Sequence, residues 1–147
     1  MSDKTFIPDI PAEKTAPASQ IGATFESLCA TISQRKDAGE ESYTYQLLKG
    51  NLDTLLKKVS EEALEVALAA KEAQMLDAYS SSEELHDHAV DHLRYEAADV
   101  IYHLLVVLER FDIPLDELAA ELNTRMTVQE RPVGGICLQE EHVRRGK

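Results

Sequence analysis

The chain has 147 residues, of which 44% are hydrophobic, enough for one domain with a packed core. Its formal net charge of −12 at pH 7 argues against nucleic acid or an anionic membrane as a partner. A phosphorylated substrate is still compatible with this charge, because local cations can reverse the field in a cleft. Cys29 and Cys137 match no metal-binding spacing and suit a reducing compartment. The N-terminus lacks a signal-peptide core, and no apolar run approaches the ~20 residues that span a bilayer, so we expect a soluble, cytoplasmic protein.

Hydrophobic spacing and turn residues predict an all-α fold, since no strand pattern of convincing length appears. Residues 1–20 are rich in proline and predict a flexible arm, and residues 127–147 predict an extended or mobile tail. Between them lies one helical domain, residues 21–126, whose helices we expect at 21–37, 42–48, 52–79, 83–111 and 114–126. Ser42 or Thr44 and then Asn51 supply N-caps, and Pro114 begins the last helix. The two long helices should face each other.

Two acidic pairs stand inside the apolar stretches of the two long helices. Glu62 shares a helix face with Glu65, and Glu96 with Asp99, because residues three or four apart are neighbours. Like charges at that spacing destabilise a helix by roughly 0.2–0.5 kcal/mol per pair, and burying them costs far more unless they are neutralised. The apolar surroundings predict that both pairs are buried, the alternative being a solvated acidic face. A divalent cation held by the four carboxylates would neutralise them.

Carboxylates without thiolates or clustered imidazoles favour Mg²⁺ or Mn²⁺ over zinc. We therefore assign the metal ligands to Glu62, Glu65, Glu96 and Asp99. Glu61 lies about 100° around the helix from Glu62 and is our candidate for activating a water or contacting a second ion. The alternative for Glu61 is an exposed helix residue.

Histidines near the second acidic pair allow two interpretations. His103 shares the stripe of Glu96 and Asp99, and either donates a hydrogen bond to a ligating carboxylate or is a satisfied core histidine. His88 and His92 are four residues apart but lie in a polar stretch, so we assign no metal site to them.

Three segments give the chain a likeness to a known family. They are Ser42-Tyr43-Thr44, residues 57–66 with a Glu-Glu-x-x-Glu pattern, and residues 96–106 with Glu-x-x-Asp followed by Tyr-His. Over about residues 21–126 the chain resembles the MazG-type all-α nucleotide pyrophosphohydrolases and, within them, phosphoribosyl-ATP pyrophosphatase of histidine biosynthesis. Ser60 departs from the glycine found in many members, and the stretch between Glu65 and Glu96 is somewhat long.

The resemblance implies hydrolysis of phosphoribosyl-ATP at the α–β phosphoanhydride, with phosphoribosyl-AMP and pyrophosphate as products. It implies Mg²⁺ as cofactor, with Mn²⁺ as an alternative, and it places catalysis at Glu61, Glu62, Glu65, Glu96 and Asp99. Our candidates for phosphate contact are Lys49, Lys57, Lys58, Lys71 and Arg94. Each of these five could instead be a surface residue of an amphipathic helix.

Other functions compete with this one. A house-cleaning pyrophosphohydrolase of the same superfamily would act on free NTPs or dNTPs through the same metal site. A di-iron carboxylate bundle would carry Glu-x-x-His on two helices, but only Glu83-x-x-His86 fits. A non-enzymatic acidic adaptor would show no effect of divalent cations on its stability.

The apolar stretch 104–108 predicts a second subunit whichever function is correct, and we expect a homodimer with a shared helical core.

Overall fold

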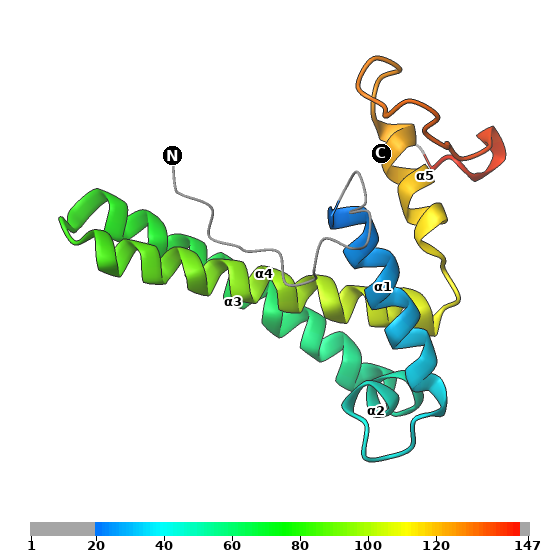
Figure 1. Ribbon diagram of the computed structural model, residues 1–147, viewed down its shortest axis with the longest axis horizontal. Coiled ribbons are helices and arrows are strands. Elements are labelled where there is room, and N and C mark those ends of the chain that lie inside the picture. Colours follow the sequence, from blue (N-terminus) through cyan, green and yellow to red (C-terminus); the bar gives the residue numbers. More distant parts are fainter. Residues whose placement is uncertain (1–19, 145–147) are drawn as a thin grey trace, which may run out of the picture.

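A computed structural model describes residues 20–144, and every regular element in this part of the chain is helical (Figure 1). The α-helices are α1 (Gln20–Gln34), α2 (Tyr43–Lys49), α3 (Leu52–Tyr79), α4 (Glu83–Arg110) and α5 (Leu115–Arg125). Two short 3₁₀ helices complete the set, η1 (Arg35–Asp37) and η2 (Glu140–His142). The all-α prediction is thus confirmed. Apart from Gln20, the predicted arm at 1–20 lies outside the described residues.

Two long helices, α3 and α4, lie side by side and form the body of the fold (Figure 1). Each begins with a side-chain cap: the Asn51 Oδ1 accepts from the Asp53 N–H at 2.9 Å, and the Ser82 Oγ accepts from the Leu85 N–H at 3.4 Å. Such caps satisfy donors that the first turn of a helix leaves free. Three serines, residues 80–82, make the turn between the helices, which therefore run antiparallel.

The core lies where α1 and α2 pack against one end of the α3–α4 pair. Its buried members are Ile32, Leu47, Leu48, Leu55, Leu105 and Val106. The Ser42 Oγ accepts from the Tyr45 N–H at 3.3 Å, which confirms Ser42 as the N-cap of α2. The Arg110 guanidinium donates to the carbonyls of Leu47 and Gly50, both at 2.8 Å. These contacts cap the C-terminal end of α2 and fix it against α4.

A close approach explains the glycine at the end of α2. A Cβ at Gly50 would lie 2.5 Å from the backbone carbonyl oxygen of Gln46, a distance that real Cβ atoms essentially never show. The backbone itself is extended there, with φ −76°, so crowding and not a positive φ requires glycine. Gly50 lets the chain turn directly from α2 into α3.

The segment after α5, which we expected to be extended or mobile, returns to α5. The Asn123 amide donates to the Ile136 carbonyl at 2.8 Å, and the Leu138 N–H donates to the Thr124 Oγ1 at 3.0 Å. The Arg131 Nε donates to the Asn123 carbonyl at 2.7 Å. Together α5 and this segment stand away from the α3–α4 pair (Figure 1). Within residues 20–144, no helix combines the length and apolarity that crossing a bilayer requires.

Candidate metal centre

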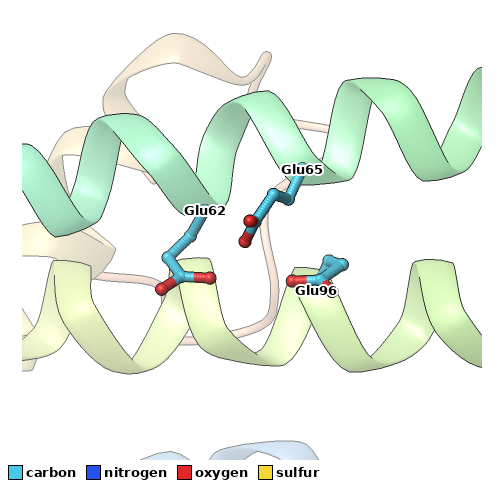
Figure 2. A group of neighbouring side chains, drawn as sticks. All are labelled: Glu62, Glu65 and Glu96. Atoms are coloured by element: carbon cyan, nitrogen blue, oxygen red, sulfur yellow. The ribbon is translucent and has the colours of Figure 1, made fainter.

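Three carboxylates meet between α3 and α4. One oxygen from each of Glu62, Glu65 and Glu96 lies within 4.8 Å of the others. Figure 2 shows Glu62 and Glu65 reaching down from α3 and Glu96 meeting them from α4. No other group of three or more His, Cys, Asp or Glu side chains comes this close within residues 20–144. A single cation could bind all three carboxylates at once. We refer to these three residues as the carboxylate cluster.

Two members of the cluster are buried, and one is open to solvent. Glu62 is 5% exposed and Glu96 8%, as their apolar surroundings predicted. Glu65 is exposed, and Asp99 is half-buried, so burial of these two is less complete than expected. Glu65 is open because the adjacent face of α3 is uncovered in the single chain.

The three carboxylates of the cluster repel one another when no cation is bound between them. The pKa of Glu65 is raised, first by its hydrogen bond with Glu62, then by desolvation and by the charge of Glu96. A hydrogen bond between two carboxyl groups needs a proton on one of them, because a carboxylate can only accept. The cluster therefore favours the uptake of positive charge, either as a proton or as a metal ion.

Two lysines flank the cluster on the α3 side. The Lys58 Nζ lies 3.3 Å from the Glu62 Oε1 and 3.3 Å from the Glu61 Oε2, and the Lys57 Nζ lies 3.2 Å from the Glu61 Oε1. The pKa of Glu61 is accordingly lowered, first by its hydrogen bond from Lys57 and then by that from Lys58. The pKa of Lys58 is raised, chiefly by Glu62 and then Glu61. Glu61 thus lies on the flank of α3, outside the cluster but joined to it through Lys58.

A histidine touches the cluster on the α4 side. The His92 Nε2 lies 2.9 Å from the Glu96 Oε1, and its Nδ1 lies 3.6 Å from the Glu72 Oε2. Sequence reasoning assigned this histidine no site. The spacing of four between His92 and Glu96 was visible in the sequence, but the contact with Glu72 depends on how α4 lies against α3.

Asp99 and His103 lie beyond the cluster along α4. Asp99 is not one of the three carboxylates that converge. The His103 Nδ1 lies 2.9 Å from the Asp99 backbone oxygen and 3.9 Å from the Glu62 Oε1. Because a carbonyl only accepts, Nδ1 carries a hydrogen and donates to it. His103 is 5% exposed and therefore behaves as the satisfied core histidine, since the Glu62 carboxylate is beyond hydrogen-bond distance.

The Ser-Tyr-Thr segment holds α2 against α4 beside the cluster. The Tyr43 hydroxyl lies 3.0 Å from the His103 Nε2, and the Thr44 Oγ1 lies 2.7 Å from the Tyr102 hydroxyl. The pKa of Tyr43 is raised, first by burial. The charge of Lys58 opposes this rise, and Tyr102, Glu62 and Asp99 add to it. Tyr43 is thus close enough to the acidic residues for their charge to affect its pKa. Sequence reasoning did not place Tyr43 near the site.

The other basic residues predicted to contact phosphate lie outside the cluster. Lys49 is exposed at the end of α2. The Lys71 Nζ donates to the Gln74 Oε1 at 2.6 Å, and the Arg94 guanidinium pairs with Asp91 at 2.6 Å. Among residues 20–144, no ion pair joins these three side chains to the cluster. Their contact with phosphate stays a prediction.

Comparison with known proteins identifies a family and several relatives. The family described as phosphoribosyl-ATP pyrophosphohydrolase matches residues 25–126. The chain is 37% identical over 105 residues to the phosphoribosyl-ATP pyrophosphatase of Rhizobium johnstonii, covering 71% of this chain and 84% of that protein. It is 39% identical over 103 residues to the phosphoribosyl-ATP pyrophosphatase of Pyrobaculum aerophilum, covering 69% of this chain and 94% of that protein.

A longer relative and the absence of a structural match complete the comparison. The chain is 33% identical over 126 residues to the histidine biosynthesis bifunctional protein HisIE of Halalkalibacterium halodurans, covering 85% of this chain but 53% of that protein. The chain therefore spans about half the length of this bifunctional relative. No solved structure matches the chain. On the match over residues 25–126 and these identities, the chain belongs to the phosphoribosyl-ATP pyrophosphohydrolase family.

Proposed function

We propose that the protein hydrolyses phosphoribosyl-ATP at the α–β phosphoanhydride and releases pyrophosphate and phosphoribosyl-AMP, as a step of histidine biosynthesis. The observation that carries the proposal is the carboxylate cluster, three acidic oxygens within 4.8 Å in a chain of this family. A chain with net charge −12 needs a local source of positive charge before it can hold a triphosphate. A cation at the cluster would provide it.

The donor set fits Mg²⁺. All three groups offer carboxylate oxygens, and a hard cation such as Mg²⁺ or Mn²⁺ prefers oxygen ligands. The raised pKa of Glu65, due first to Glu62, indicates a site that gains from added positive charge. When bound there, Mg²⁺ would offset the charge of the triphosphate and lower the pKa of a water. We assign Glu62, Glu65 and Glu96 as its ligands, with Asp99 one turn further along α4 as the fourth.

The flanking residues then have distinct tasks. Lys57 and Lys58 lie beside the cluster and are the basic residues best placed to receive phosphate oxygens. As long as both lysines pair with Glu61, they keep its pKa low, which makes this carboxylate a weak proton acceptor. Phosphates that draw the lysines away would release Glu61 to accept a proton from the attacking water. We therefore retain Glu61 as the candidate for water activation.

Two of the competing functions lose support. Glu83 and His86, the one Glu-x-x-His pair, lie at the start of α4 and outside the cluster, which disfavours a di-iron centre. A house-cleaning NTP pyrophosphohydrolase would use the same carboxylates, but the family match is to enzymes of phosphoribosyl-ATP. Substrate choice separates these two functions directly.

Pyrophosphate release from phosphoribosyl-ATP tests the proposal. With Mg²⁺ present we expect release from phosphoribosyl-ATP, little release from ATP or dNTPs, and none from any substrate in EDTA. The measurement is a coupled pyrophosphate assay on the purified full chain. Release from plain nucleotides in preference would move the protein to the house-cleaning class, and release that persists in EDTA would remove the metal from the mechanism.

Substitutions connect that activity to the site. Glu62→Gln and Asp99→Asn keep the shape of the side chain but remove its charge. Each should lower turnover by at least the roughly 10–100-fold that even an outer partner of a metal ligand contributes. Glu26→Gln, at an exposed position of α1, is the matched control and should retain activity. Full activity in Asp99→Asn would reduce the ligand set to the three residues of the cluster.

Neutralising one carboxylate should stabilise the protein when no metal is present. Because hydrogen bonding with Glu62, desolvation and the Glu96 charge raise the pKa of Glu65, the folded chain is destabilised where Glu65 is charged, above its folded pKa. Glu65→Gln should therefore unfold at higher urea in EDTA at neutral pH, while gaining less than the unsubstituted protein from added Mg²⁺. A variant that is weaker in EDTA, or that gains equally from Mg²⁺, would contradict the self-repelling cluster.

We also propose that the chain works as a homodimer. Leu64, Leu68 and Met75 follow one stripe of α3 and are 59%, 60% and 58% exposed. Apolar stripes of this kind mark protein–protein contacts, and this one lies next to the exposed Glu65. A second copy packed there would complete the helical core. Sedimentation equilibrium should give twice the chain mass, and a monomer at micromolar concentration would contradict the dimer.

A further inference from the structure

We infer that His92 is a positioning residue that orients the Glu96 carboxylate for the metal ion. The inference rests on the proposed function, because it concerns the same cluster. Its basis is the contact between the His92 Nε2 and the Glu96 Oε1 at 2.9 Å. At this distance the ring and the carboxylate are in direct polar contact, which limits how one of the two carboxylate oxygens can turn.

Glu96 depends on this contact more than the other members of the cluster depend on theirs. It is the only carboxylate that α4 contributes to the cluster. Glu62 has Lys58 at 3.3 Å, whereas the one basic side chain that contacts Glu96 in the described part of the chain is His92. A carboxylate that is 8% exposed is costly to bury without a partner. Without His92, Glu96 would face Glu65 and Glu62 with no basic side chain in contact with it in the described part of the chain.

His92 also lies near a carboxylate of the opposite helix. Its second nitrogen, Nδ1, lies 3.6 Å from the Glu72 Oε2 on α3. The imidazole thus lies between a carboxylate of α3 and a ligand of α4, and both contacts use the ring in one orientation. Lys58 is the counterpart at the other side of the cluster, where it touches Glu61 and Glu62. One basic residue from each long helix therefore supports the carboxylates at the seam.

His92 is better suited to orient Glu96 than to bind the metal. Its near nitrogen is occupied by the Glu96 carboxylate, and His92 is not part of the group of three oxygens that converge. Hydrogen-bond partners of ligating carboxylates fix the direction of the ligand, and their loss costs about 10–100-fold in metal affinity. The expected effect of removing His92 is therefore on the affinity for the ion, with turnover recovered when the ion is saturating.

Metal binding by the full chain tests this role without substrate. The free Mn²⁺ signal in EPR, titrated against protein, gives the dissociation constant for the unsubstituted chain and for His92→Ala. We expect His92→Ala to bind Mn²⁺ roughly 10–100-fold more weakly. His92→Gln, whose amide can donate to Glu96 from the same face of the helix, should recover most of the affinity. His88→Ala removes an exposed histidine one turn earlier and is the matched control, expected to bind as the unsubstituted protein does.

The results separate this inference from the metal centre as a whole. Unchanged Mn²⁺ affinity in His92→Ala, beside an unsubstituted chain that binds, would overturn the positioning role alone. Equal losses in His92→Ala and His88→Ala, or no recovery in His92→Gln, would overturn it as well. An unsubstituted chain that binds no Mn²⁺ would overturn the metal centre and this inference together. In the Mg²⁺-dependent assay, the half-saturating Mg²⁺ concentration should rise in His92→Ala while kcat at saturating Mg²⁺ is kept.

Discussion

The mutual repulsion of buried carboxylates at the seam between α3 and α4 is the constraint on which the rest of the structure depends. Glu62 and Glu96 are almost fully buried, and Glu65 joins them within 4.8 Å. Like charges this close repel one another unless a proton or a cation lies between them. The raised pKa of Glu65, due first to Glu62, is a consequence of this crowding of carboxylates. A protein that keeps such an arrangement gains from binding positive charge, which is the property a magnesium enzyme needs.

The surrounding fold keeps the carboxylates from separating. Long helices that pack along their length fix which residue faces which, so Glu96 of α4 cannot move away without disturbing the contacts on either side. The core around Leu55, Leu105 and Val106 anchors one end of the helix pair. Arg110 holds the end of α2 there, and the Tyr43–His103 contact brings α2 beside the acidic residues. The repulsion is thus resisted by apolar packing and by hydrogen bonds outside the cluster.

The distribution of basic residues suits a triphosphate substrate. The chain is acidic overall, but Lys57 and Lys58 lie at the edge of the cluster and pair with Glu61 and Glu62. The ion pairs with Glu61 are open to solvent, so they are weak and can be exchanged for contacts with phosphate. Lys71 and Arg94 pair with neighbours on their own helices and away from the cluster. Local charge at the seam, more than net charge, therefore determines what can bind.

Local patterns in the sequence were enough to predict most of the fold. The bounds of α3 agree with the expected 52–79, because the Asn51 cap and the serines at 80–82 are strong local signals. The pairing of Glu62 with Glu65 followed from helical spacing, but their approach to Glu96 in preference to Asp99 depends on the register of two helices, which no local pattern encodes. The same register explains why the contact of His92 with Glu72 was missed. The path of residues 127–144 back to α5 was missed because it depends on side-chain hydrogen bonds from Asn123 and Thr124. Hydrophobic periodicity and capping residues predict where helices begin and end, but they do not predict contacts between elements that are distant in sequence.

The most direct test of the central claim is a crystal structure of the Mn²⁺-soaked protein with anomalous data. The account predicts one strong anomalous peak between α3 and α4, bound by the carboxylate oxygens of Glu62, Glu65 and Glu96. A peak elsewhere on the molecule, or carboxylates that turn away from one another with no peak between them, would contradict it.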